Sequence, residues 1–305
     1  MSRFASRLLH FGVVIWGVTT LVFIALRLTG DPAMMLLPGN PTAEDLRLAH
    51  AKLGMDQPLL VQYLAFIRDA FSGNFGTSFQ HGVPAISIVL DRLPATALLA
   101  GSALLLSCTL AIPLGLEAAL NHRRLADLVV MLVAVLGQGV PFFWLGLMLI
   151  LVFGVELRWL PTGGYGGFEH LVLPSLTLAG YIGASTARLT RSSMLEELGQ
   201  DYMRTARAKG LGLHMAAIKH GLRNAAIPIV TFLGLQMGLL LGGTVVVEEI
   251  FGWPGVGRLL LQAISYRDYP VVQAATFILA MIFLAVNLTV DLLYLALDPR
   301  MRDRH

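Results

Sequence analysis

The segment with the clearest chemical character is DYMRTARAKGLGLHMAAIKHGLRNAAIP, residues 201–228. It is basic and rich in helix-forming residues, and long hydrophobic runs lie on both sides of it. We expect a short helix over Asp201–Lys209, a stop at Gly210, and a second helical run over His214–Asn224 that leads into Pro228. A short helix held at both ends by membrane spans would carry force from a docked partner into the protein. The segment therefore predicts a docking surface, and the simpler reading of Gly210 is a helix stop alone.

Common catalytic and metal-binding patterns are missing from the chain. It contains no HExxH, CxxC or GxSxG motif, and its eight histidines are scattered. His214 and His220 are six residues apart, which does not place them on one helix face as ligands. No Gly-Lys dipeptide occurs, so the chain has no Walker A loop to bind a nucleotide. We expect no catalytic residue, metal or bound cofactor here, and any ATPase, with its ATP and magnesium, must be a separate chain.

Composition places the chain in a membrane. Hydrophobic residues make up 56% of it and charged residues 13%, and the mean hydropathy is +0.71, whereas soluble domains carry about 25% charged residues. The net charge of +3 is small and the basic residues form no continuous groove, which argues against nucleic acid as a partner. The single cysteine, Cys108, lies in an apolar run and cannot form an internal disulfide. These features predict an all-α polytopic membrane protein in contact with lipid.

We expect six membrane-spanning helices, each needing about 20 residues to cross the hydrocarbon core. The first span is too long for a cleaved signal peptide and lacks a small-residue cleavage site before Gly30-Asp31-Pro32, so it should remain as an anchor. The predicted spans are Leu8–Leu28, Ala95–Leu120, Leu125–Phe153, Leu171–Leu189, Ala225–Val247 and Val271–Leu297.

The distribution of Lys and Arg predicts the orientation. When the N-terminus is placed in the cytoplasm, most of the 22 basic residues fall on the cytoplasmic side. They include Arg123 and Arg124 in one turn, the basic segment described above, and the C-terminal Arg300, Arg302 and Arg304. We therefore expect both termini and the basic segment to face the cytoplasm.

The segment Gly30–Pro94, on the outer side in this orientation, has the pattern of a small helical cap. Thr42–Asp45 resembles an N-terminal capping box, and Pro58 opens a second amphipathic stretch. The apolar stripe of that stretch comprises Leu60, Leu64, Ile67 and Phe71. The chain then divides into an N-terminal span (1–29), an extracytoplasmic helical segment (30–94), a transmembrane core with the loop 190–224 (95–297), and a cytoplasmic tail (298–305).

A few polar residues lie within the predicted spans. An ionisable residue in a span is a functional candidate by default. Arg188, however, is close enough to the cytoplasmic end to reach water along its own side chain, and Asp291 is near enough to pair with it. A structural role and a role in a transport path both remain open for these residues: Gln138, Gln236, Asn287 and Asp291.

At these positions the chain resembles the permease subunits of binding-protein-dependent ABC importers, in the B-type of the dipeptide, oligopeptide and nickel group. The superfamily pattern is Glu-Ala-Ala, three residues, Gly, about nine residues and Ile-x-Leu-Pro. Here Arg204-Thr205-Ala206 replaces Glu-Ala-Ala, Gly210 matches the glycine, and Leu222 the leucine. Arg204 for Glu, His220 for Ile and Arg223 for Pro depart from that pattern, but RTARAKG and HGLRNAAIP are typical of the peptide and nickel group. WLPTGGYGGFEHLVLPSLTLA at 159–179 and DLLYLALDPRMR at 291–302 share the resemblance.

The resemblance implies the type I ABC importer permease fold in a bacterial inner (plasma) membrane. It implies a homologous C-type permease as the second half of the path, two ABC ATPases, and a periplasmic or lipid-anchored binding protein that meets the outer cap and the Gly252–Gly257 loop. In this group the basic loop is the coupling helix that sits in a cleft of the ATPase. The residues that would make that contact are Asp201, Arg204, Thr205, Ala206, Lys209, Gly210 and Leu211.

The cargo is less well specified than the class. Di- and oligopeptides are the expected cargo, and nickel, a nickel chelate, or glutathione-like or opine-like cargo are the alternatives. A secondary transporter is the alternative class, but such proteins show paired inverted repeats and buried coupling-ion residues, which this sequence lacks. An intramembrane enzyme or receptor is disfavoured by the missing catalytic groups.

Overall fold

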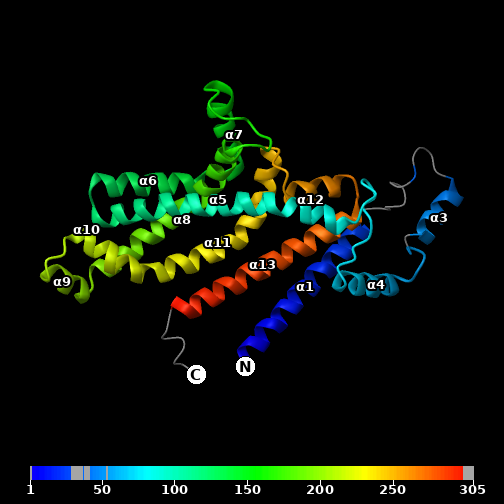
Figure 1. The fold of residues 1–305 in the computed structure, drawn as a ribbon, viewed down its shortest axis with the longest axis horizontal. Coiled ribbons are helices and arrows are strands. Elements are labelled where there is room, and N and C mark those ends of the chain that lie inside the picture. The colour runs from blue at the N-terminus through cyan, green and yellow to red at the C-terminus, as the bar shows by residue number, and fades with distance from the viewer. Residues whose placement is uncertain (1, 29–36, 38–41, 53, 298–305) are drawn as a thin grey trace. The chain divides into compact units, whose positions relative to one another are not determined.

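The computed structural model describes residues 2–28, 37, 42–52 and 54–297, and the side chains of residues 2–10, 52, 239, 241 and 291–297 fall outside that description. The described residues are nearly all helical, and their only pairing of the β type is an isolated bridge between Thr77 and Pro84. The predicted tail, 298–305, lies outside the described residues. The helices, labelled in Figure 1, are α1 (Ser2–Leu28), α3 (Ala43–Lys52), α4 (Leu59–Phe71), α5 (Ala85–Leu120), α6 (Leu125–Gly139), α7 (Phe142–Leu149), η1 (Ile150–Glu156), α8 (Phe168–Leu198), α9 (Asp201–Ala208), α10 (Leu213–Ala216), η2 (Ala217–Gly221), α11 (Leu222–Ile250), α12 (Val256–Ser265) and α13 (Tyr269–Leu297).

The chain forms two compact units. Unit 1 comprises residues 1–96 and 254–284, and unit 2 comprises residues 97–253 and 285–305. The four-part division made from the sequence did not group residues 254–284 with the N-terminal segment. The boundaries of that four-part division stay a prediction.

Three single helices contain apolar stretches long enough to cross a bilayer: Phe11–Leu28 in α1, Ala85–Leu120, which is the whole of α5, and Tyr269–Val290 in α13. Two further candidates are bent pairs of helices, so length and composition give up to five spans among the described residues when each pair is counted as one span. The prediction of an all-α polytopic membrane protein is confirmed. The second span starts earlier than expected, because α5 begins ten residues before Ala95, inside the segment assigned to the outer cap.

The predicted third span, Leu125–Phe153, is not one helix. It consists of α6 and of α7 with η1, and the two parts meet at 104°. Val140 has an extended backbone, with φ −86° and ψ 122°, and Pro141 follows it. Proline lacks an N–H and disfavours the helical conformation in the preceding residue, so Gly139-Val140-Pro141 ends α6. Figure 1 shows α7 directed away from α6.

Helix α8 contains the predicted fourth span, Leu171–Leu189, although it is too polar to qualify by composition. Its middle carries Thr177 and Thr186, which are buried, and Tyr181, which is exposed. Helices α6, α7 and α11 pack around it. A central helix does not have to be apolar because its neighbours, and not lipid, cover it. This position explains how α8 can be a sixth span.

The predicted second run after Gly210 is longer than expected. It begins at Leu213 and continues without a break through α10, η2 and α11, and Pro228 lies inside α11 rather than at a re-entry point. The fifth span bends by 60° between Gly238 and Gly242. A single continuous run therefore joins the turn after α9 to the membrane.

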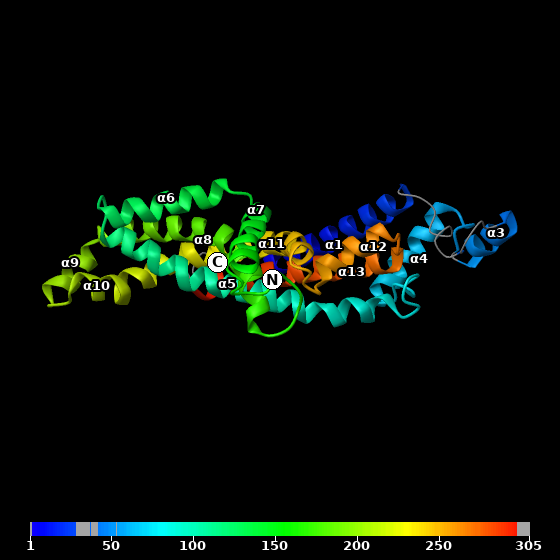
Figure 2. The ribbon, with the colours of Figure 1, turned by 90° about the horizontal axis from the view of Figure 1, so that it is seen from above.

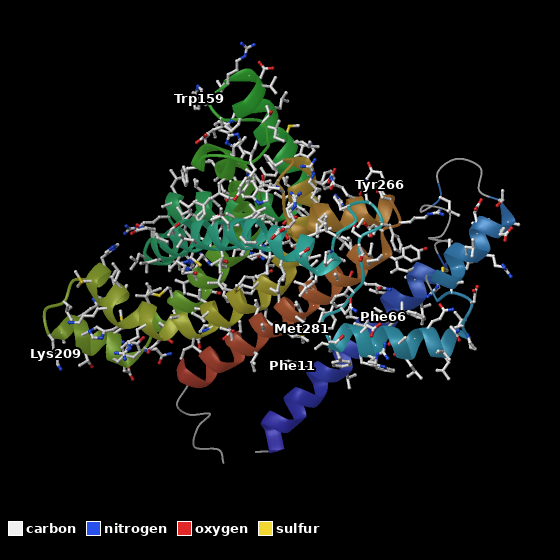
Figure 3. All side chains as sticks on the ribbon, turned by 45° about the vertical axis from the view of Figure 1, so that its right-hand side comes forward. Phe11, Phe66, Trp159, Lys209, Tyr266 and Met281 are labelled. Carbon is white, nitrogen blue, oxygen red and sulfur yellow. The ribbon has the colours of Figure 1, made fainter. Side chains whose placement is uncertain are left out.

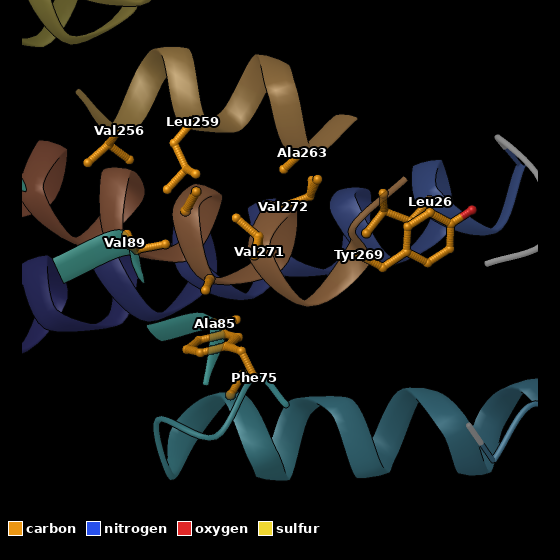
Figure 4. Packing of buried hydrophobic residues seen from close by; sticks show 13 residues of the cluster. Leu26, Phe75, Ala85, Val89, Val256, Leu259, Ala263, Tyr269, Val271 and Val272 are labelled. Carbon is orange, nitrogen blue, oxygen red and sulfur yellow. The ribbon is translucent and has the colours of Figure 1, made fainter. Parts of the chain in front are cut away.

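Unit 1 has its own apolar core, which joins the start of α5 to α12 and α13. Val89 of α5, Val256 of α12 and Val271 of α13 are almost fully buried in it (Figure 4). A buried carboxylate closes the core on one side: Asp268 accepts hydrogen bonds from the Ser78 hydroxyl (2.5 Å) and from the backbone N–H groups of Phe79 and Gln80. These bonds fix the turn before α13.

The N-terminal signals of α3 and α4 are confirmed, but the packed face of α4 is not the apolar stripe. The Thr42 hydroxyl accepts a hydrogen bond from the Asp45 N–H, and the Asp45 carboxylate accepts one from the Thr42 N–H, which is a capping box. Tyr63 and Phe66 of α4 pack on Phe23 of α1, with ring centroids 5.4 and 5.6 Å apart. The stripe residues Leu60, Leu64 and Phe71 are instead exposed.

Candidate coupling surface

Helix α9 is the short helix predicted in the basic segment. Asp201 lies in its first turn and Arg207 in its last, and both complement the helix dipole. Lys209 ends the helix and Gly210 follows with φ +91°, a conformation that favours glycine. The Leu211 N–H then donates to the Ala206 carbonyl at 3.3 Å, which closes the turn. The local sequence thus accounts for both ends of α9.

One face of α9 packs against the rest of unit 2. Met203 and Ala206 are buried with Ala216 of α10, and Leu198, Tyr202 and Leu211 pack around them. Residues 203 and 206 are three apart, so they lie on the same side of the helix. Figures 1 and 2 both show α9 beside α10, next to the ends of α8 and α11.

Polar contacts tie this region to the long helices. The Tyr202 hydroxyl donates to the Glu197 carboxylate near the end of α8, and the Asn224 amide of α11 lies 3.5 Å from the same carboxylate. Burial and the neighbouring Glu197 raise the pKa of Tyr202, so the phenol keeps the proton that it donates. Gly221 allows a further close contact, because a Cβ there would lie 2.9 Å from the Met194 methyl group. A displacement of α9 would therefore act on α8 and α11 together.

The opposite face of α9 is exposed and mainly cationic. Arg204 lies on this face, Arg207 is exposed at its edge, four residues from the buried Met203, and Lys209 is exposed just past the end of the helix, where Figure 3 shows it at the tip of the turn. Arg204 approaches Asp201 at 3.4 Å, but both side chains are over 80% exposed, so this ion pair contributes little to stability. The face is a positively charged surface whose charges remain available to a partner.

The predicted contact residues separate into two groups. Asp201, Arg204, Thr205, Lys209 and Gly210 are exposed, whereas Ala206 is buried and Leu211 is half-buried in the supporting cluster. Ala206 therefore faces the protein. The prediction omitted Arg207, which is exposed and lies three residues after Arg204, a spacing that could have identified it.

The polar residues predicted within the spans differ in their contacts and burial. The Gln138 amide of α6 donates to the Ser185 hydroxyl of α8 at 2.5 Å, a contact between helices. Gln236 and Asn287 are half-buried. The Asp291 side chain lies outside the described residues, and so does its proposed pairing with Arg188.

An ion pair missed in the sequence lies near the same end of unit 2. Asp127 of α6 accepts two hydrogen bonds from the Arg191 guanidinium of α8, at 2.5 and 2.7 Å. It accepts another from the Arg123 N–H and lies 3.2 Å from the His122 ring. Asp127 is almost fully buried, so the pair joins α6 to α8 and closes the turn between α5 and α6. No local signal reveals it, because its partners are 64 residues apart.

No group of three or more metal-ligating side chains occurs within the part of the chain that the structure describes. The geometry instead defines a multi-pass helical protein in which a surface helix with exposed charges is fixed to two long helices. Such an arrangement is suited to transmitting movement from a docked partner to the membrane helices. The comparisons with known proteins identify a family of membrane transport proteins, as follows.

Residues 111–303 match the family described as the binding-protein-dependent transport system inner membrane component. Residues 1–100 match the N-terminal component of the same systems. The glutathione transport system permease protein GsiC of Escherichia coli (strain K12) is 43% identical over 298 residues, which is 97% of each chain. GsiC of Salmonella typhi is 43% identical over 286 residues, which is 93% of this chain and 94% of that one. The chain belongs to this family and is a permease subunit of an ABC importer in the bacterial inner membrane.

Solved structures show the same fold. An inward-facing MetNI methionine ABC transporter matches with a TM-score of 0.55 and 14% identity, over 69% of this chain and 96% of that chain. An amino acid ABC transporter matches with a TM-score of 0.50 and 18% identity, over 68% and 93%. The type I permease fold expected from the sequence is thereby confirmed.

Proposed function

We propose that this chain forms half of the translocation path of an importer for short peptides of the glutathione type, and that α9 is its docking element for an ATP-hydrolysing subunit. The observation that carries the docking assignment is the division of α9 into two faces. Met203 and Ala206 fix one face to the protein, and the exposed Arg204, Arg207 and Lys209 make the remaining surface of the helix and its C-terminal turn positive. In this proposal α9 and both chain termini lie in the cytoplasm, in agreement with the excess of basic residues there.

The supporting contacts give α9 a mechanical role. Closure of two ATPase subunits around ATP and magnesium would displace α9, and its bonds through Glu197 would carry that displacement into α8 and α11. Exchange between inward- and outward-open states requires contacts that differ between the two states. The ATPase supplies such a difference because it grips α9 differently when open and when closed. A homologous second permease completes the path, and a substrate-binding protein delivers the cargo from outside.

The cargo assignment rests on the relatives. The 43% identity to the glutathione permease proteins extends over nearly the whole chain, which favours a glutathione-like tripeptide. Di- and oligopeptides share its chemistry, with an amino group, amide bonds and a carboxylate. A nickel ion has no such groups, so nickel uptake is measured separately in the uptake experiment that follows.

Uptake by a strain that lacks its own peptide and glutathione importers tests the cargo. The complete system would be expressed, and uptake of radiolabelled glutathione, a dipeptide and nickel ion would be compared. We expect saturable, ATP-dependent glutathione uptake that excess dipeptide reduces. Nickel uptake without glutathione uptake would contradict the proposal, and purification of the complex without an ATPase subunit would contradict the docking role of α9.

A further inference from the structure

Helix α8 has a polar face that its neighbours leave partly open, although Ser185 on this face bonds to Gln138 of α6 and the Tyr181 ring packs on Phe142 of α7. Tyr181 is 42% exposed, and Arg188 and Ser192 are also exposed. Residues seven apart return to the same side of a helix, so Tyr181 and Arg188 lie on one face, two turns apart. The other side of α8, with Ile182, Thr186 and Met194, is buried.

This face does not have the character of a surface that contacts lipid. Helix α6 of the same unit provides the comparison, because its exposed side chains are apolar: Leu128, Val129, Leu132, Val133, Val135 and Leu136. Arg188 lies in the last turn of the predicted span, and an arginine there directs its charge to water, either at the cytoplasmic surface or in a water-filled path, and not to lipid. Within the part of the chain that the structure describes, Arg188 has no ion-pair partner within 4.0 Å.

A small cavity adjoins the same face. It has a volume of about 290 Å³ and is bordered by Tyr181 of α8, Phe142 of α7 and Gln236 of α11. The Gln236 amide oxygen is buried and has no hydrogen-bond partner among the described residues. A buried acceptor without a donor is unfavourable, and an N–H group that enters the cavity would satisfy it.

We propose that this face of α8 is the wall that the subunit contributes to the path, and that Arg188 binds the carboxylate of the peptide in transit while the Gln236 amide oxygen accepts a hydrogen bond from a peptide N–H. The inference rests on the proposed peptide cargo. Guanidinium suits this role because it forms two parallel, charge-assisted hydrogen bonds to a carboxylate. Every peptide has a terminal carboxylate and N–H groups, so this pair selects peptides without selecting their side chains.

The spacing of the two groups fits a short peptide. Tyr181, which borders the cavity with Gln236, is seven residues from Arg188, or about 10 Å along a helix that rises 1.5 Å per residue. An extended chain of three residues spans about 10 Å. A tripeptide can therefore place its carboxylate at Arg188 while one of its N–H groups reaches the cavity.

The test uses the complete complex in proteoliposomes, with saturating binding protein loaded with radiolabelled glutathione, so that recognition by the binding protein does not limit the rate. The variants are Arg188→Gln, Arg188→Lys and the matched control Arg124→Gln, which removes an exposed arginine from the turn before α6. We expect Arg188→Gln to lower transport about tenfold or more, as for the loss of a charge-assisted hydrogen bond. ATP hydrolysis stimulated by the binding protein should persist, and Arg124→Gln should match the wild type. Arg188→Lys keeps the charge but loses the second parallel hydrogen bond, so its transport should lie between that of Arg188→Gln and that of the wild type.

A second measurement does not depend on the folding of the arginine variant. A photoreactive phenylalanine derivative at Tyr181 should cross-link to the labelled peptide during turnover, and the same group at Leu132 on the apolar face of α6 should not. Wild-type transport by Arg188→Gln, or equal cross-linking at the two positions, would overturn the inference. Absence of glutathione transport by the wild-type complex would instead contradict the proposed cargo, so the two failures are distinguishable.

Discussion

Two turns of unit 2 carry basic residues but use them in opposite ways. At the turn between α5 and α6 the charges serve the fold: the Arg123 N–H, the His122 ring and the Arg191 guanidinium of α8 all contact the buried Asp127 carboxylate, although the Arg123 and Arg124 side chains are themselves exposed. Around α9 the Arg204, Arg207 and Lys209 side chains are exposed, and the carboxylate beside Arg204 is the equally exposed Asp201. The two turns lie near each other, since the His214 ring of α10 is 3.5 Å from the Glu117 carboxylate near the end of α5.

The difference separates structural charge from functional charge. A buried ion pair with several hydrogen bonds fixes one arrangement of helices, and loss of one partner leaves an uncompensated charge. Exposed cations contribute little to the stability of their own chain but attract an acidic partner. Substitutions of Asp127 or Arg191 should therefore change stability, and substitutions of the exposed cations around α9 should change coupling.

Replacement of Gly210 should give the largest functional effect. Gly210 has φ +91°, whereas proline is confined to φ near −65°, so Gly210→Pro must change the direction of the turn after α9. We expect peptide uptake at background level with a normal amount of the chain in the membrane. Asparagine tolerates positive φ better than most residues, so Gly210→Asn should retain much of the uptake. Transport assays with membrane immunoblots measure both quantities, and full uptake by Gly210→Pro would remove the coupling role of this turn.

Removal of Arg191 should give the largest loss of stability. Arg191→Ala leaves the Asp127 carboxylate buried beside α8 without its cation, at a cost of about 3 kcal/mol, the lower end of the range for buried pairs because Arg191 is itself 22% exposed. Arg124→Ala, in the same turn but exposed, is the matched control and should leave stability unchanged. The free energy of unfolding of the purified complex measures the difference. Equal stability of the two variants would mean that the ion pair does not hold α6 to α8.

The elements of this comparison were predictable to different degrees. Hydrophobic length identified α1, α5 and α13, and the basic composition with Gly210 identified α9, because these signals are local. The break in the third span was also encoded locally, in Gly139-Val140-Pro141, and the length of the apolar run concealed it. The helical period places Met203 and Ala206 on one face, so the burial of Ala206 was accessible as well.

The remaining features depend on contacts between distant segments. The Asp127–Arg191 pair joins residues 64 apart, and the partly open face of α8 follows only from the positions of α6, α7 and α11 around it. A mixed helix such as α8 gives no sequence signal of which face its neighbours will cover, because both of its faces carry polar residues. The burial of Thr186 and the exposure of Arg188 are therefore properties of the packing.

Charge reversal on the exposed face of α9 should weaken the association with the ATPase without unfolding the permease. We expect Arg204→Glu with Arg207→Glu to reduce the affinity for the ATPase about tenfold at low salt, because charges at the edge of an interface act mainly through long-range attraction. The reduction should become smaller as ionic strength rises and shortens the Debye length. Titration of the purified permease pair with the ATPase at two salt concentrations measures it, and thermal stability serves as the control. A loss that does not depend on salt would point to a shape contact and not to charge.

The smallest effect is expected for Asp201, the carboxylate beside Arg204. Its side chain is 94% exposed and lies 3.4 Å from Arg204, so Asp201→Asn should not measurably change the stability of the permease. The same substitution makes the face more positive, and an acidic ATPase cleft should then bind it equally well or slightly better. This combination separates the two uses of charge. Asp127→Asn, in the first turn of α6, should destabilise the chain, whereas Asp201→Asn should alter only ATPase binding and its salt dependence. A clear loss of stability in Asp201→Asn would show that the α9 turn, too, depends on its charges for its own fold.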